Sequence, residues 1–217
     1  LEAICLYLPD PLERARVEVT NPANPQEKKE LDFKSNNFSA FVFKSISDPY
    51  VGQLSLLRVF SGTLASNTGF YNVTKKTRER IGHIHVLQGK EQRILETASA
   101  GDIIAIPKLK GTATGDSLAE EKNQVNFAET LFPEPAISAS VKPKSRADED
   151  KISIALHKLT DEDPTLKITR DSQTKEMLMS GLGDLHLNVM IHRLKKRFNV
   201  DVELGTPKVS YMETITK

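Results

Sequence analysis

Hydrophobic residues in the stretch 184–198 recur every three or four positions, which is the spacing of one face of a helix. The predicted apolar face consists of Leu187, Met190, Ile191, Leu194 and Phe198. The opposite side carries a cationic stripe made of His192, Arg193, Lys196 and Arg197. Just before this helix, Gly181 and Gly183 predict a tight corner, and Asp184 is placed to serve as the helix N-cap. The stretch therefore predicts a helix that is buried on one side and offered to an acidic partner on the other.

The residues around this helix predict a β-α-β-β-α-β order. Apolar residues alternate in the predicted strands, which lie at 137–141, 166–168, 177–180 and 200–204. Helical spacing at 152–159 predicts the other helix, which ends before Pro164. This is the order of the ferredoxin-like α+β fold, in which two helices cover one antiparallel sheet. We expect this domain to span residues 131–217.

The first half of the chain shows short alternating segments with turn residues between them and no helical spacing. The predicted strands lie at 38–43, 53–60, 70–73, 80–87 and 102–106. This pattern is typical of an antiparallel β-barrel or sandwich, and we expect the domain with its linkers to span residues 13–130. The polar stretch 16–34, with a charged run at 27–30, is interpreted as a solvated loop. Residues 1–12 predict the end of a helix that prolines terminate.

Composition excludes several classes of protein. With 217 residues, of which 38% are hydrophobic and 27% charged, the chain is long enough for two small globular domains. Its formal net charge is +1, so any contact with RNA must come from a local basic patch. The single cysteine, Cys5, excludes an internal disulfide framework and a Cys-based zinc site. No apolar run approaches the roughly 20 residues of a membrane span and no signal peptide is evident, so we expect a cytoplasmic monomer.

Few residue patterns in the sequence indicate a nucleotide-binding or metal site. No G-x-x-x-x-G-K-[ST] loop for nucleotide phosphates occurs, and the glycine-containing stretch 111–116 lacks the lysine, so it is interpreted as a turn. His83 and His85 would lie on one face of a strand, but no cysteine or carboxylate nearby completes a metal site. The sequence therefore predicts no catalytic residue, no metal site and no cofactor within this chain.

Several short motifs occur in an order that resembles one known family. Residues 180–187 read SGLGDLHL and resemble the S-G-M-G-E-L-H-L segment in the third domain of elongation factor G. Its flanking motifs are similar as well, at 132–135, 162–165 and 205–211. The first half resembles the second-domain β-barrel of translational GTPases at 48–52, 58–64, 80–82, 100–103 and 114–118. The resemblance implies an antiparallel β-barrel followed by a ferredoxin-like domain.

For the whole protein, the resemblance implies a bacterial-type translational GTPase whose GTP-binding domain ends in residues 1–12. The full-length protein would use GTP and Mg²⁺ on the ribosome to drive movement of transfer RNA and messenger RNA. This chain would dock on the ribosome, through small-subunit ribosomal RNA and ribosomal proteins. It would also couple its own GTP-binding domain to the distal domains.

The resemblance also implies which residues form sites. An interdomain corner, where fusidic acid lodges in the family, would consist of Pro164, Thr165, Leu185, His186 and Arg193. We expect His186 to act mechanically there and not as an acid or base. Candidate contacts to ribosomal RNA form two clusters, Lys75, Lys76, Arg78 and Arg80 in the barrel, and Arg193, Lys195, Lys196 and Arg197 on the last helix. Phosphate contacts need only cations that reach outward.

Some residues depart from the family pattern. Leu182, Asp184 and Asn188 stand where elongation factor G commonly has Met, Glu and Glu, and Met212 stands in the position of an Arg. These departures leave open a diverged paralogue. Asn67 begins a turn where the family usually has Gly-Asp, and Asn tolerates the left-handed conformation of such a turn. Two alternatives also remain, a ribosome-protection or recycling factor of the same superfamily and a stand-alone RNA- or protein-binding module.

Overall fold

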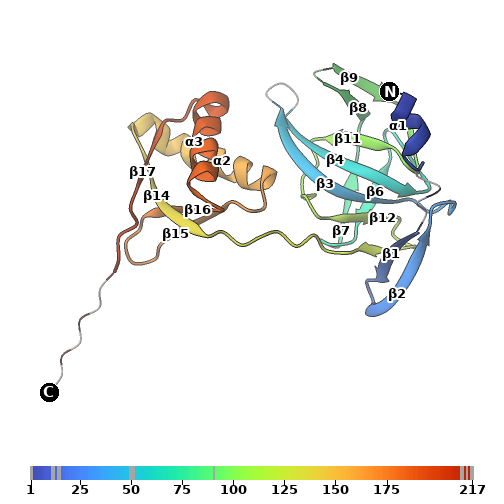
Figure 1. Ribbon diagram of the computed structural model, residues 1–217, viewed down its shortest axis with the longest axis horizontal. Coiled ribbons are helices and arrows are strands. Elements are labelled where there is room, and N and C mark those ends of the chain that lie inside the picture. The colour runs from blue at the N-terminus through green and yellow to red at the C-terminus, as the bar shows by residue number, and fades with distance from the viewer. Residues whose placement is uncertain are drawn as a thin grey trace. The chain divides into compact units, whose positions relative to one another are not determined.

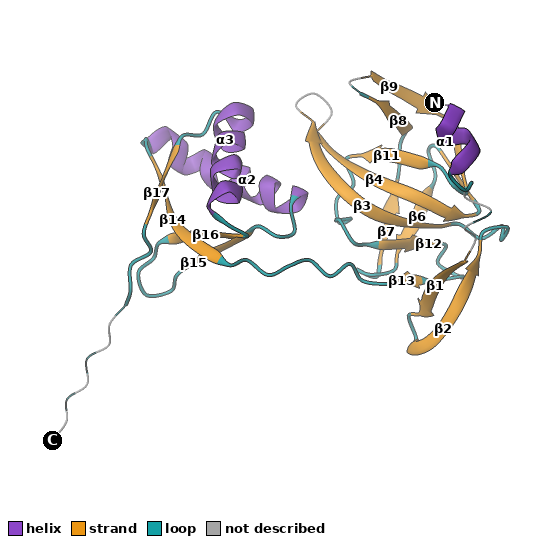
Figure 2. Ribbon diagram, viewed as in Figure 1, coloured by secondary structure: helices purple, strands orange, loops and turns teal. Residues whose placement is uncertain are grey.

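The computed structural model describes residues 2–10, 13, 16–48, 52–89, 91–210, 213 and 215. The predicted turn at Pro49 and the departure at Met212 lie outside these residues. The chain divides into two compact units, Leu1–Thr130 and Leu131–Lys217. Figure 2 shows that strands dominate the first unit and that the second combines helices with strands.

The first unit contains one short helix, Glu2–Tyr7 (α1), and otherwise antiparallel strands (Figure 1). All the described residues of α1 are exposed. The strands are Arg16–Asn21 (β1), Asn24–Asp32 (β2), Ser39–Asp48 (β3), Gly52–Ser61 (β4), Thr63–Ala65 (β5), Gly69–Asn72 (β6), Thr77–Arg80 (β7), Ile84–Gln88 (β8), Glu91–Leu95 (β9), Thr97–Ser99 (β10), Ile103–Pro107 (β11), Ser117–Ala119 (β12) and Asn126–Phe127 (β13). They form an eight-stranded sheet in the order β7-β6-β12-β3-β4-β11-β8-β9, a three-stranded sheet β13-β1-β2 and the pair β10-β5.

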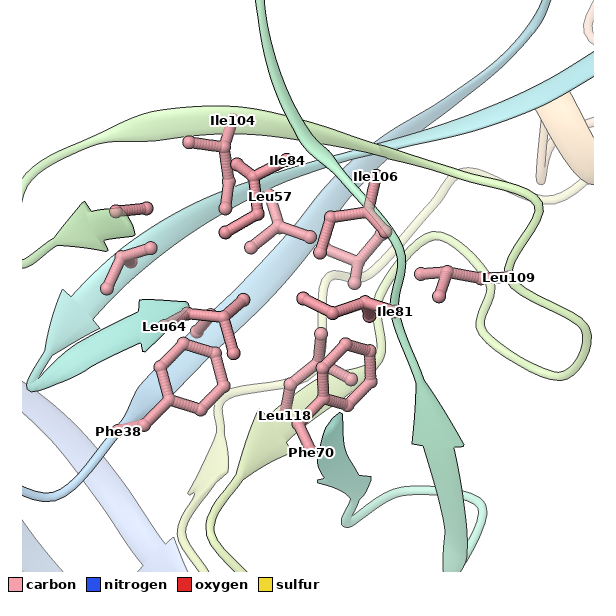
Figure 3. Close-up of a cluster of buried hydrophobic side chains, with 14 residues drawn as sticks. Phe38, Leu57, Leu64, Phe70, Ile81, Ile84, Ile104, Ile106, Leu109 and Leu118 are labelled. Carbon is pink, nitrogen blue, oxygen red and sulfur yellow. The ribbon is translucent and has the colours of Figure 1, made fainter. Parts of the chain in front are cut away.

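One core holds the large sheet together and shows that the sheet is curled. Phe70 on β6 and Ile84 on β8 come from opposite ends of the strand order, yet both belong to one buried cluster with Leu57 of β4. Figure 3 shows these side chains converging with those of Ile104 and Ile106. Strands from both ends of a sheet can share a core only if the sheet wraps around it, so this unit has the predicted antiparallel, barrel-like architecture.

The prediction of a loop at 16–34 is wrong, because this stretch forms the hairpin β1–β2. Val17 and Val19 alternate with polar residues in β1, and Val19 packs with Leu31 and Phe127 in a small cluster of their own. The charged run at 27–30 does lie in solvent, but on a strand and not in a loop. Most of the apolar residues of this hairpin lie on β1, so β2 shows little alternation of apolar and polar residues. The charged run therefore did not suggest a strand.

Two local features of the barrel also bear on the predictions. The single strand predicted at 80–87 is wrong, since β7 ends at Arg80 and β8 begins at Ile84. Residues 81–83 between these strands have no strand structure, although Ile81 is buried in the core. The alternation of apolar residues therefore did not show that one strand ends and another begins. Asn67 adopts φ 61°, which confirms that it supports a left-handed turn.

The second unit has the predicted ferredoxin-like order. Its elements are Ile137–Pro143 (β14), Arg146–Glu162 (α2), Lys167–Arg170 (β15), Met177–Gly181 (β16), Asp184–Phe198 (α3) and Val202–Gly205 (β17). The strands pair antiparallel in the order β15-β16-β14-β17. Both helices pack on the sheet through a core that includes Leu156 and Leu159 of α2 and Leu187 and Leu194 of α3.

The start and end of α3 show how its sequence sets its length. Gly183 is the N-cap residue, and no side chain caps the helix. The prediction that Asp184 is the N-cap is therefore wrong; as the first helical residue, Asp184 instead places a negative charge near the positive end of the helix dipole. At the other end Asn199 is left-handed, with φ 52°, and its backbone N–H donates to the carbonyl of Leu194.

None of the helices in the described part of the chain is long and apolar enough to cross a membrane.

Candidate functional site

His186 is bound on both sides of its ring. Its Nδ1 accepts a hydrogen bond from the backbone N–H of Leu182, with a distance of 3.1 Å between the nitrogens. Because Nδ1 accepts, the proton of the neutral ring lies on Nε2, which donates to Oδ2 of Asp163 at 3.1 Å. The imidazole thereby joins the corner before α3 to the loop after α2, and both its tautomer and its orientation are fixed.

Asp163 is the centre of that loop. Its Oδ1 accepts hydrogen bonds from the backbone N–H of Thr165, at 3.0 Å, and from the Thr165 hydroxyl. Burial raises the pKa of this carboxyl, but the hydrogen bonds from Thr165 and the interaction with His186 outweigh burial and leave the pKa below its ordinary value. Asp163 is thus held ionised, as an acceptor for Thr165 on one side and His186 on the other.

Gly181 makes room for the ring. A Cβ atom at this position would lie 2.8 Å from Cδ2 of Leu187 and 2.9 Å from Nδ1 of His186. At Gly183 a Cβ atom would meet nothing within 4 Å, and the backbone there is extended, with φ 177°. The prediction that both glycines supply backbone freedom is therefore wrong for this structure: Gly181 is required for space, and Gly183 for neither space nor conformation.

An apolar and cationic stripe runs along α3 from this corner. Leu185 is 78% exposed and Val189 is 41% exposed, and Arg193 follows at the same spacing of four residues, so the three lie on one side of the helix. Leu182, 43% exposed, extends the apolar part into the corner. A groove on this side is lined by Asn188, Val189, His192, Arg193, Lys196 and Arg197.

The predicted corner residues are only partly brought together. Thr165 is joined to His186 through Asp163, and Pro164 lies half-buried between those two loop residues. Leu185 is the neighbour of His186 but its side chain is in solvent. Arg193 lies two helical turns from Leu185 along α3.

The cations of α3 divide into paired and unpaired residues. Nη1 of Arg197 lies 2.7 Å from Oε2 of Glu162, a carboxylate that is 9% exposed, and Nζ of Lys195 lies 2.9 Å from Oδ2 of Asp201. Arg193 and Lys196 make no ion pair within the described residues. Within the predicted four-residue cluster, Arg193 and Lys196 are therefore the cations without an ion pair to a described residue, whereas Lys195 and Arg197 already have carboxylate partners.

The barrel cluster is divided in the same way. Nζ of Lys75 donates to the carbonyl of Gly111 at 2.6 Å, and Arg78 forms an ion pair with Glu121. Lys76 and Arg80 are exposed and make no ion pair with any described residue. Two further cations that the sequence did not predict, Lys108 and Lys110, lie beside this cluster. The groove next to β7 is lined by Thr77, Arg78, Glu79, Arg80, Lys108, Lys110 and Gly111.

A carboxylate brings these distant segments together. Both oxygens of Glu79 accept backbone hydrogen bonds, from Lys110 at 2.9 Å and from Gly111 at 3.1 Å, so the segment after β11 is held against β7. No local signal in the sequence predicts that contact, because 31 residues separate Glu79 from Lys110. Lys76 and Lys108 both have positive φ, 55° and 60°, a conformation that costs a lysine free energy and that Asn or Gly would adopt more easily.

The stretch 111–116 does not fit a nucleotide phosphate. Several of its backbone N–H groups are already hydrogen-bonded: Gly111 donates to Glu79, Ala113 to the Asp116 carboxylate at 2.8 Å and Gly115 to the carbonyl of Val42 at 2.7 Å. Asp116 is 4% exposed and also accepts from Nδ2 of Asn72, at 2.9 Å. An anion here would meet the carboxylates of Glu79 and Asp116, and the stretch forms a turn, as predicted.

No metal site forms among the described residues, where no group of three or more His, Cys, Asp or Glu side chains converges. His83 precedes β8 and is exposed, and His85 lies within β8, so the prediction that they share a strand face is wrong. Burial lowers the pKa of His85, and the nearby His83 lowers it further, which favours a neutral ring.

Comparisons with known proteins agree over both units. The family model described as elongation factor G domain 2 matches residues 37–121, and the model described as elongation factor G, domain III matches residues 132–206. A crystal structure of a protein from Thermus thermophilus is similar over 96% of this chain, with a TM-score of 0.76 and 33% sequence identity. This chain spans only 29% of the length of that protein's chain.

The two glycines of the corner provide a matched test of its packing. Gly181→Ala should destabilise the second unit by about 1–3 kcal/mol, because the added methyl group must displace Leu187 or His186. Gly183→Ala should cost less than about 1 kcal/mol, since only the N-cap preference changes. Urea unfolding followed through the amide NMR signals of β16 and α3 measures both, and equal losses would contradict the packing described here.

Proposed function

We propose that this chain docks a translational GTPase on the ribosome and couples its GTP-binding domain to the distal domains. The chain belongs to the elongation factor G family and contains domains that correspond to the second and third domains of that family. The family predicted from the sequence motifs is confirmed by the matches to both domain models. The full-length protein would act in the cytoplasm and promote GTP-dependent movement of transfer RNA and messenger RNA.

The observation that carries the coupling role is the double hydrogen bonding of His186. A ring hydrogen-bonded to both Leu182 and Asp163 joins the corner to the loop after α2. Leu185 is exposed next to it and can contact another domain without disturbing the core. We assign Pro164, Thr165, Leu185, His186 and Arg193 to the surface that meets the chain's own GTP-binding domain. Movement of that domain would be transmitted through the corner to β16 and α3.

Exposed cations support the docking role. Lys76 and Arg80 in the barrel, and Arg193 and Lys196 on α3, are exposed and unpaired among the described residues. Such side chains suit the phosphates of ribosomal RNA, whose binding needs positive charge but no reading of bases. Lys75, Arg78, Lys195 and Arg197 serve the same surfaces indirectly, because their internal pairs hold the surrounding segments in place. Ribosomal proteins are the other partners that we propose.

GTP and Mg²⁺ belong to the rest of the protein in this proposal. The turn at 111–116 places carboxylates where a nucleotide phosphate would have to bind, and no cluster of His, Cys, Asp or Glu side chains that could hold Mg²⁺ forms among the described residues. In this proposal the chain contributes to hydrolysis through contacts with the GTP-binding domain, and the catalytic groups belong to the rest of the protein.

Replacement of His186 tests the coupling role in the full-length protein. His186→Ala should lower ribosome-stimulated GTP turnover about five- to tenfold and leave the Kd for GTP unchanged, because the corner loosens while the nucleotide site is intact. The matched control is His157→Ala, an exposed histidine on α2, which should change neither quantity. Loss of GTP affinity, or full stimulation in His186→Ala, would count against the role assigned to the corner.

Salt dependence tests the docking role. The double variant Lys76→Ala/Arg80→Ala should bind ribosomes more weakly, and the slope of log K against log salt concentration should fall by about one for each phosphate that the variant no longer binds. Lys28→Ala/Lys29→Ala removes the same charge from β2, where both lysines are paired with glutamates, and should leave the slope unchanged. Identical slopes for both variants and the wild type would exclude the barrel cluster as an RNA contact.

A further inference from the structure

Glu176 directly precedes β16, and this residue is only 9% exposed. In space its carboxylate lies between the side chains of Lys142 and Lys208. Its Oε2 accepts a hydrogen bond of 2.9 Å from the backbone N–H of Lys208, which lies beyond the end of β17. Its Oε1 lies 3.6 Å from Nζ of Lys142 on β14 and 3.7 Å from Nζ of Lys208. One side chain thus connects the beginning of β16, the adjacent strand β14 and the segment 206–210.

We propose that Glu176 is a latch that holds the segment 206–210 on the sheet and so fixes the direction in which the chain leaves the second unit. The segment has no regular secondary structure, so no ladder of hydrogen bonds fixes its position. Between Thr206 and Ser210, the bond from Lys208 to Glu176 is the only hydrogen bond to the sheet among the described residues. Release of this single carboxylate would therefore free the segment while β17 stays paired with β14.

The chemistry of the carboxylate suits a latch that opens and closes. Oε1 is buried but accepts no hydrogen bond in the described part of the chain, and it is stabilised only by the two ammonium groups. A buried acceptor without a hydrogen bond costs free energy, and opening would return that oxygen to water. Lys142 and Lys208 are themselves well exposed, with side chains 62% and 67% accessible, so solvent reaches the site from their side. The closed state is thus favoured by charge and by one hydrogen bond, but not by burial.

The surrounding charges set the pH at which the latch would open. The cleft is lined by Lys142 of β14, Glu149 of α2, Arg170 of β15, and Lys175 and Lys208. The hydrogen bond from Lys208 lowers the pKa of Glu176; burial opposes this, and the two lysines lower the pKa further, which leaves it below its ordinary value. A lowered pKa means that the ionised, closed state is most stable above the ordinary pKa and is lost as the pH falls through the pKa of the folded protein.

If the proposed function is correct, the latch would set how the second unit passes motion to whatever follows it. That consequence rests on the proposed function, but the latch itself does not. Its test needs neither ribosomes nor nucleotide, so failure of the latch and failure of the proposed function are distinguishable.

Amide hydrogen exchange at Lys208, measured by NMR on the whole chain and compared with the rate for the unstructured sequence, tests the latch. In the wild type the amide should be protected about tenfold or more at neutral pH, and this protection should fall as the pH drops below the ordinary pKa of Glu176. Glu176→Ala should abolish the protection. Glu176→Gln keeps an acceptor oxygen but loses the charge, as protonation does, so at every pH it should show the reduced protection that the wild type reaches only in acid.

Glu149→Gln is the matched control. It removes a carboxylate of the same cleft that makes no hydrogen bond or ion pair with Lys208 among the described residues, and it should leave the protection unchanged. The amides of β14 and β16 report in the same spectra whether a variant is folded; if Glu176→Ala unfolds, Glu176→Gln and the wild-type pH series decide. An unprotected Lys208 amide in the wild type, or full protection in a folded Glu176→Ala variant, would overturn the proposal.

Discussion

His186 accepts the Leu182 N–H on one nitrogen and donates to Asp163 with the other, and the ring therefore has one tautomer and one orientation available to it. The surrounding structure follows from this constraint. The strand–helix corner must pass close to the ring, which requires the absence of a side chain at Gly181. Asp163 must stay ionised, which its hydrogen bonds from Thr165 achieve in spite of burial. The exposed side chain of Leu185 directly precedes this hydrogen-bonded ring.

The same physical device recurs in the barrel and at the end of the second sheet. Carboxylates that accept backbone N–H groups hold irregular segments in place: Glu79 holds 110–111, Asp116 holds its own turn and Glu176 holds Lys208. In each case the cations nearby remain largely exposed. Charge–amide hydrogen bonds are stronger than neutral ones, so a loop can be ordered without burying much apolar surface. Surfaces that must meet a charged partner benefit from this arrangement, because hydrophobic anchoring would cover the cations.

The sequence predicted the large elements well and their long-range polar contacts poorly. The periodicity of α3 identified its buried face, since Leu187, Met190 and Leu194 are the buried residues of that helix. The hairpin β1–β2 was missed because its apolar residues belong mainly to one strand. His186 was identified by a motif, but its partner Asp163 lies 23 residues away and no spacing rule connects them. Lys108 and Lys110 lie beside the barrel cluster because Glu79 accepts a hydrogen bond from the backbone of Lys110, and no sequence pattern predicts that contact.

The sequence also could not predict which cations form internal contacts and which remain unpaired. Lys75 and Arg78 belong to the same short run as Lys76 and Arg80, but their partners Gly111 and Glu121 lie 36 and 43 residues further along the chain. Whether a lysine in such a run is free depends on those folded contacts. A count of charges in a window therefore overstates what the surface offers to a partner, in the barrel as on α3.

In the proposed function, these two domains make a GTPase responsive to the ribosome. The most direct measurement is multiple-turnover GTP hydrolysis by the full-length wild-type protein with and without ribosomes. We predict slow hydrolysis alone and strong stimulation by ribosomes, which high salt should abolish as phosphate contacts weaken. GTP binding with no stimulation at any salt concentration would contradict the claim.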